Sequence, residues 1–295
     1  MGTPQETLAP EKATRVLASL VEGNSINSTV RMTGVAHTTI LRLLARVGAA
    51  CERFHNAQVR YLDTTQVQCD EVWSFCYAKQ RNVPAKYRGK EGFGSIWTWT
   101  ALDADSKLLI SFLASDRSQA AADALIADLK SRTMMRLQIT SDGYGSYIDA
   151  IARAFPNRND VDYAEEIKVY QTVPQPGMSP NSAASRYSPG RVKSVSRIPR
   201  MGWPIDKNIS TSYMERWNLS LRMGNRRFTR LTNGFSKKFE NHCHMLALWA
   251  VYYNFCRKHK SLGGKTPAMA AHLTDYVWTA SDLLALDMWS ESMAA

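Results

Sequence analysis

The stretch VQCDEVWSF, residues 67–75, decides the fold prediction and places two acids in its middle. Its residues are mostly strand formers, and no Gly or Pro interrupts them. Successive side chains of a strand point to opposite faces of the sheet, so the pleat is predicted to separate Asp70 from Glu71. Glu71 shares its face with bulky apolar residues, whereas Asp70 lies on the more polar face with Gln68, Val72 and Ser74. Because an ionised carboxylate is costly to bury, Asp70 is the better candidate for a site.

The chain around this stretch predicts a mixed α/β domain. Helices with a 3.6-residue period are expected at 118–132 and 145–155, and further strands at 94–103, 107–115, 136–142 and 162–171. Three antiparallel strands followed by helix, strand, helix and strand predict a mixed five-stranded sheet with helices on its faces.

Residues 11–49 predict a small all-α unit that precedes the sheet. A helix ending at Gly23, a short helix ending at Gly34 and a third helix over 36–48 fit the helix-turn-helix pattern. In that motif the start of the last helix contacts base edges, here His37, Thr38, Thr39 and Arg42. An ordinary three-helix bundle is the alternative.

The charge of the chain indicates a polyanionic partner. The net charge is +11, and in a folded chain this most often means nucleic acid. Residues 172–209 hold six of the eleven prolines and read as a basic phosphate-binding loop or a solvated linker, with Arg186, Arg191, Lys193, Arg197, Arg200 and Lys207. Residues 216–238 contain no acid and seven basic residues, Arg216, Arg222, Arg226, Arg227, Arg230, Lys237 and Lys238.

The cysteines, the apolar segments and the last helices indicate where the protein is located in the cell and how the chain divides into domains. The five cysteines form no C-x-x-C pair, and no apolar run is long enough to span a membrane, so neither structural zinc nor a membrane partner is expected. Without an apolar signal core near the N-terminus, a cytoplasmic location is expected. A core helix over 237–259 and a short helix from Thr266–Pro267 complete the domains expected at 1–60, 61–275 and 276–295, the last a tail helix.

Three carboxylates are candidates for chemistry: Asp70 in the first strand, Asp142 at a strand end before Gly143, and Glu215 on a helix in the most basic part of the chain. Phosphodiester chemistry suits such a set, because two Mg²⁺ ions held by carboxylates activate the nucleophile and stabilise the leaving oxygen. Each residue also has a structural alternative. Asp142 fits a turn, Ser212-x-x-Glu215 fits a capping box, and Asp70 could lie on a solvated edge strand.

Three segments resemble transposases of the insertion sequence 1 family, which are DDE recombinases: CDEVWSF (69–75), ITSDGYGSY (139–147) and ISTSYMERWNLSLRMGNRRFTRLTNGFSKKFENH (209–242). The resemblance runs from about Gln66 to about Leu273. YYNFCRKHKSLGGKTPAMAA (252–271) also resembles a C-terminal signature shared among transposases and integrases.

This resemblance implies an RNase H-like fold and a catalytic triad of Asp70, Asp142 and Glu215 that holds two Mg²⁺ ions, with Mn²⁺ as a substitute. Asn218 would share the helix face of Glu215, and transposon-end phosphates would be held by Arg222, Arg226, Arg227 and Arg230. Double-stranded DNA, a dimer or larger synaptic assembly, and a prokaryotic, nucleoid-associated location are expected.

Two departures from the family pattern stand out. Trp217 occupies a position where a polar residue, often Gln, is expected, and the basic insertion over 172–209 is long. The sequence thus predicts a DNA transposase that cleaves DNA and transfers strands. A non-catalytic DNA-binding regulator and an RNase H-like nuclease without strand transfer are the alternatives. Glu71 is expected to pair with a basic residue from 216–230 and to orient the site from behind.

Overall fold

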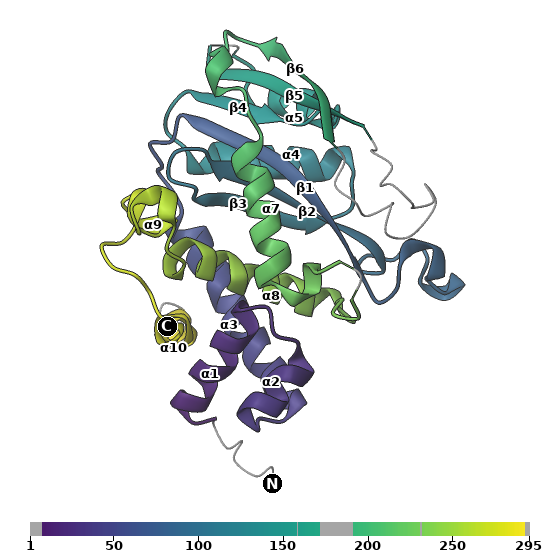
Figure 1. Ribbon diagram of the computed structural model, residues 1–295, viewed down its shortest axis with the longest axis vertical. Helices are drawn as coiled ribbons and strands as arrows, with labels where there is room; N and C mark the ends of the chain where they lie inside the picture. Colours follow the sequence, from purple (N-terminus) through teal and green to yellow (C-terminus); the bar gives the residue numbers. More distant parts are fainter. Residues whose placement is uncertain (1–7, 158, 172–190, 231, 293–295) are drawn as a thin grey trace.

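The computed structural model describes residues 8–157, 159–171, 191–230 and 232–292, and its centre is a mixed sheet (Figure 1). Its strands are β1 (Gln66–Cys76), β2 (Gly94–Asp103), β3 (Leu109–Ser115), β4 (Leu137–Ser141), β5 (Val161–Gln171) and β6 (Arg191–Met201). The order in the sheet is β3-β2-β1-β4-β5-β6. β1 pairs antiparallel with β2 and parallel with β4, so β1 is a central strand.

The first five strands lie where the sequence predicts them, but the prediction of a loop over 172–209 is wrong for its second half. Residues 191–201 form β6, which pairs antiparallel with β5. The prolines and positive charges of this segment favoured a loop prediction over the alternating side-chain pattern of a strand. Pro199 is tolerated because it lies beside a register irregularity, on a strand at the edge of the described sheet. Residues 172–190 of that predicted loop lie outside the described part of the chain.

Helices cover both faces of the sheet. α4 (Gln119–Arg132) packs against β2, β3 and α5 (Ser146–Ala154), and both helices lie behind the sheet in Figure 1. α7 (Ser212–Gly224) crosses the front face over β1. The pleat of β1 therefore directs alternate side chains toward α7 or toward the layer of α4 and α5.

The N-terminal helices are α1 (Pro10–Val21), α2 (Ile26–Thr33) and α3 (His37–Gln58). Gly34 ends α2 with a φ of 69°, as predicted. The prediction that the third helix ends at Gly48 is wrong, because α3 continues to Gln58. A Cβ atom at Gly48 would lie 2.5 Å from the carbonyl oxygen of His244. Gly48 therefore allows a close approach between α3 and the C-terminal part of the chain.

That part consists of α8 (Phe239–Val251), a π-helical turn (Tyr252–Cys256), α9 (Pro267–Ala270) and α10 (Ala280–Ser292). α8 packs along α3, and α10 packs against α1 and α3 (Figure 1). One hydrophobic core runs from α1 through α8 to the sheet. Within the described residues, no helix combines the length and the apolar character needed to cross a membrane.

Candidate active site

One cavity of about 380 Å³ brings the three predicted carboxylates together. Asp70 reaches it from β1, Asp142 from the end of β4 and Glu215 from the first turn of α7. Its other polar lining side chains are Glu166, Lys168, Thr211, Asn218, Arg222 and the Tyr170 hydroxyl. Carboxylates and basic groups from four elements thus meet in one open pocket.

Strand register places the two aspartates side by side. β1 and β4 are parallel, and Gln68 is the partner of Thr140. Asp70 lies two residues further along β1, and Asp142 lies two residues further on, just past the end of β4, so the two aspartates occupy neighbouring positions. The Asp142 carboxylate also accepts the backbone N–H of Tyr144 at 3.0 Å, so the turn role of this residue and its place in the site coexist.

Asp70 is held by two hydrogen bonds. One carboxylate oxygen accepts the backbone N–H of Glu71 at 2.8 Å, and the other accepts the side-chain N–H of Asn218 at 2.6 Å. Burial and the neighbouring Asp142 raise the pKa of Asp70 to about 6. Asn218, predicted to contact DNA, is buried, and its side-chain N–H orients Asp70.

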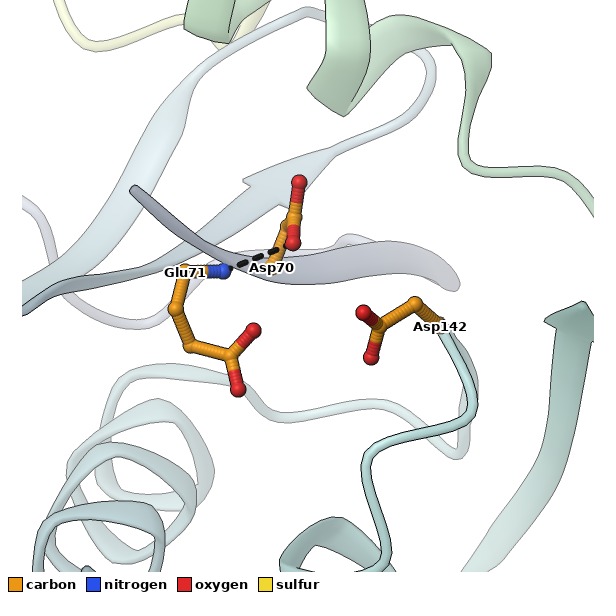
Figure 2. A group of neighbouring side chains, drawn as sticks. All are labelled: Asp70, Glu71 and Asp142. Atoms are coloured by element: carbon orange, nitrogen blue, oxygen red, sulfur yellow. Dashed lines mark hydrogen bonds between the residues drawn. The ribbon is translucent and has the colours of Figure 1, made fainter. Parts of the chain in front are cut away.

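Glu71 leaves β1 on the side opposite Asp70, as the pleat predicts (Figure 2). One carboxylate oxygen from each of Asp70, Glu71 and Asp142 lies within 4.8 Å of the other two. Burial, Asp142 and Asp70 raise the pKa of Glu71 to about 8, and Arg117 opposes this. Asp70 lines the open cavity and Glu71 does not, so Asp70 remains the better candidate for contact with substrate.

The prediction that Glu71 pairs with a residue from 216–230 is wrong. Its partner is Arg117, whose Nε lies 3.6 Å from Glu71 Oε1. The Arg117 guanidinium lies 4.5 Å from the ring centre of Trp97 and 4.0 Å from that of Tyr144. α7 covers the other face of β1, so its basic residues do not reach Glu71. Nothing in the sequence near Arg117 signals this pairing, which depends on the sheet.

Lys168 is a site residue that the sequence reasoning missed. Its Nζ lies 2.7 Å from Glu215, 3.0 Å from Glu166 and 3.1 Å from the Thr211 hydroxyl. Burial opposes the charge of Lys168, but hydrogen bonds to Glu215 and Glu166 raise its pKa. Glu166 and Lys168 are two apart on a predicted strand, so the alternation could have placed them on one face. Lys168 holds Glu215 at the edge of the cavity.

The donor set fits a divalent cation such as Mg²⁺, which prefers oxygen ligands. Asp70 and Asp142 offer neighbouring carboxylates, whereas Glu215 lines the same cavity but is paired with Lys168 and lies outside the group within 4.8 Å. Two buried oxygen atoms next to them, Glu71 Oε1 and Asn218 Oδ1, have no hydrogen-bond partner among the described residues. Burial and neighbouring carboxylates raise the pKa values of Asp70 and Glu71, and a bound cation would offset the repulsion between these charges.

The basic residues predicted on β6 have different surroundings. Lys193 is exposed. Arg197 lies 3.9 Å from Glu166 and 3.5 Å from Asp206, and Arg200 pairs at 2.6 Å with the buried Glu165. Arg200 therefore compensates a buried charge instead of presenting a free guanidinium. The side chain of Arg191, at the start of β6, lies outside the described residues.

A second cavity, of about 300 Å³, joins the start of α3 to the basic segment after α7. Among its lining residues are His37, Arg226, Arg227, Lys237 and Lys238. The start of α3 and the basic segment after α7, both predicted to bind DNA, thus line the same cavity.

Not all of these basic groups are equally accessible. Burial lowers the pKa of Arg227 to about 10, and its guanidinium donates to Ser236 at 3.0 Å. Arg230 is exposed, as are Thr38 and Arg42 on α3, whereas Thr39 is partly buried. Arg222 lies at the rim of the carboxylate cavity, and Arg216 lies on another face of α7.

Comparisons with known proteins give weak likenesses only. The chain matches no protein-family model and no curated protein. It is similar to a crystal structure of a pre-cleavage Mos1 transpososome, at 10% identity and a TM-score of 0.30, over 100% of this chain and 80% of that chain. It is also similar to a cryo-EM structure of a piggyBac transposase synaptic complex with hairpin DNA. There the identity is 10%, the TM-score 0.29, and the match covers 94% of this chain and 60% of that chain. Because both TM-scores are low, function must be inferred from the site itself.

Glu71→Gln is expected to stabilise the metal-free protein at high pH. A folded-state pKa of about 8, against an ordinary 4.5, means that the folded protein keeps a proton which the unfolded chain loses. The contribution of Glu71 to the stability of the natural protein should thus fall as pH rises from about 4.5 to about 8. At pH 9 the variant should be more stable by roughly 1–3 kcal/mol, because one pKa unit corresponds to about 1.4 kcal/mol and the unpaired Arg117 offsets part of the gain. Near pH 5 the two proteins should be similar.

The measurement is thermal or urea unfolding with EDTA between pH 5 and pH 9. Glu91→Gln is the matched control, since Glu91 is exposed. A Glu71→Gln variant less stable than the natural protein at pH 9 would show that the pair with Arg117 outweighs the repulsion from the aspartates.

Proposed function

We propose that this chain is a DNA transposase of the DDE type, similar to the insertion sequence 1 family. It would bind terminal inverted repeats, cleave DNA and transfer the freed strand to a target. The convergence of Asp70, Asp142 and Glu215 in one cavity, from segments far apart in the sequence, carries the proposal. The order of β1 to β5, with three antiparallel strands followed by two parallel ones, supports an RNase H-like fold.

Asp70, Asp142 and Glu215 would hold Mg²⁺, with Mn²⁺ as a substitute. Bound Mg²⁺ lowers the pKa of water and stabilises charge on phosphate oxygens. The side chains of the protein position the carboxylates and the substrate phosphate. Asn218 fixes the Asp70 carboxylate through its 2.6 Å hydrogen bond, and Lys168 keeps Glu215 at the cavity. Arg222, at the rim, offers a positive charge to a phosphate.

DNA recognition is assigned to the N-terminal helices and the basic segments. Gly34 makes the turn before α3, and the start of α3 is largely exposed, which supports a helix-turn-helix role for His37, Thr38, Thr39 and Arg42. Because two transposon ends must be joined, the working form would be a dimer or larger assembly. A prokaryotic, cytoplasmic, nucleoid-associated location follows from this proposal.

The test uses the purified full chain and a plasmid that carries the DNA flanking its gene. With Mg²⁺ we expect cleaved ends with a free 3′-hydroxyl and joined products, and with EDTA neither. Binding without any cleavage would replace this proposal with the non-catalytic regulator. Cleavage without joining, even when pre-cleaved 3′ ends are supplied, would leave a nuclease of the same fold.

A further inference from the structure

α7 separates the carboxylate cavity from another, more basic cavity. Thr211, Glu215, Asn218 and Arg222 line the carboxylate cavity. Tyr213, Arg216 and Ser220 line the other one, and Met214, Trp217 and Leu221 are buried between them. Because residues three or four apart share a helix face, each set forms its own stripe. One short helix therefore faces two cavities at once.

This basic cavity beside Arg216 has a volume of about 800 Å³ and is lined by positive charge from several elements. No Asp or Glu is among its lining residues. The other lining groups are hydroxyls of serine and tyrosine. Its basic residues are Lys107 from the β2–β3 turn, Arg216 from α7, and Arg257, Lys258, His259 and Lys260 from the segment after the π-helical turn.

These positive charges form no ion pair in the described part of the chain, although the charges of Asp105 and Asp103 act on Lys107. Within the described residues, no ion pair involves Lys107, Arg216, Arg257, Lys258 or Lys260. By contrast, Lys168 beside the carboxylate cavity is paired with acids. Lys107 instead lies over the ring of Tyr213, with its Nζ 3.1 Å from the ring centre. Unpaired cations that converge on one cavity repel each other, and an anion relieves the repulsion.

The segment that supplies most of these charges is held in shape. The backbone N–H of His259 donates to the carbonyl of Lys265 at 2.9 Å, and that of Gly264 donates to the carbonyl of His259 at 3.0 Å. Gly263 and Gly264 have φ of 64° and 84°, which favours glycine. The loop is thus closed by its own backbone and presents Lys258 and Lys260 from a fixed position.

His259 adds a polar group without a partner. Its ring packs edge-on against Tyr253 at 4.9 Å, and its buried Nε2 has no hydrogen-bond partner among the described residues. Burial and the cations Arg257, Lys107 and Arg216 lower the pKa of His259 to about 4. The imidazole is therefore neutral at pH 7 and adds no charge to the cavity.

We propose that this basic cavity binds backbone phosphates of a DNA duplex that also occupies the carboxylate cavity. The inference deepens the proposed function and rests on it. A helix with its side chains is about 10–12 Å across, so one DNA segment can lie over α7 and reach both sides. Lys107, Arg216, Arg257, Lys258 and Lys260 neutralise phosphates, and the serine and tyrosine hydroxyls donate hydrogen bonds.

The test measures binding of a random-sequence DNA duplex of about 30 base pairs by fluorescence anisotropy, in EDTA and over a range of NaCl concentrations. Lys258→Gln with Lys260→Gln should raise Kd about 10-fold and lower the slope of log K against log salt by about 2, because each phosphate contact contributes about 0.9. Arg216→Gln, from a different element, should lower the slope by about 1.

Lys130→Gln with Arg153→Gln is the matched control. It removes the same charge from exposed residues of α4 and α5, behind the sheet. If it changes Kd and slope as much as the cavity variants do, the basic cavity has no special role and this inference fails while the proposed function stands. If the natural protein does not bind the duplex at all, both fail. Unchanged melting temperatures establish that the variants, whose sites are exposed, remain folded.

Discussion

Asp142→Asn is expected to reduce Mg²⁺-dependent DNA cleavage by more than about 100-fold. Mutation of a residue that only hydrogen-bonds to a metal ligand typically lowers metal affinity or activity by about 10–100-fold, and loss of a ligand itself should lower activity more. Asp142 lies beside Asp70 at the end of β4, and its carboxylate points toward Asp70 and Glu71 (Figure 2). Asn keeps the shape and the turn but removes one negative charge from the proposed cation site. DNA binding without metal should be retained or slightly stronger, because the cavity repels phosphate less.

The measurement compares cleavage rates and duplex affinity for Asp142→Asn and for Asp63→Asn. Asp63 is an exposed residue before β1, so it controls for the change in net charge. Cleavage by Asp142→Asn at a rate close to that of Asp63→Asn would remove Asp142 from the chemistry. Equal losses in both variants would point to a general effect of charge and not to the site.

Trp217→Ala is expected to destabilise the protein by about 3–5 kcal/mol, the usual cost of removing a buried Trp or Phe side chain. Trp217 is 1% exposed and packs edge-on against Trp249 at 5.7 Å and Tyr253 at 6.2 Å. This aromatic pocket accounts for a Trp where the family resemblance predicts a polar residue. It also fixes α7, which carries Glu215 toward one cavity and Arg216 toward the other.

Urea unfolding checks this prediction, with Leu219→Ala as the control on the same helix. Leu219 is an exposed hydrophobic, so its loss should change the free energy of unfolding by less than about 0.5 kcal/mol. Trp217→Phe should fall between the two. A loss of under about 1 kcal/mol for Trp217→Ala would mean that α7 is held by Met214 and Leu221 without the aromatic contact, since one kilocalorie is typical of ordinary substitutions.

Local pattern was sufficient for the first five strands and for the faces of β1. The alternation of residues 67–75 separated Asp70 from Glu71, and their opposite directions in Figure 2 match that prediction. Local sequence pattern gave a wrong prediction where the same residue type can serve two different structural roles. Gly48 looked like a helix end, but its missing side chain serves the contact with His244. Residues 191–201 looked like a loop because proline and charge outweighed the alternation that an edge strand needs.

The sequence by itself determined the first five strands, which side of β1 each acid occupies, and that the chain is strongly basic. These properties depend on near neighbours and on composition, so they can be read without the fold. The tertiary structure alone decided the partners of the charges. Glu71 pairs with Arg117 and Glu215 with Lys168, and cations from distant segments meet beside Arg216. Such pairings depend on which elements the sheet and α7 bring together. The local periodicity of a sequence does not encode contacts between residues that are far apart along the chain.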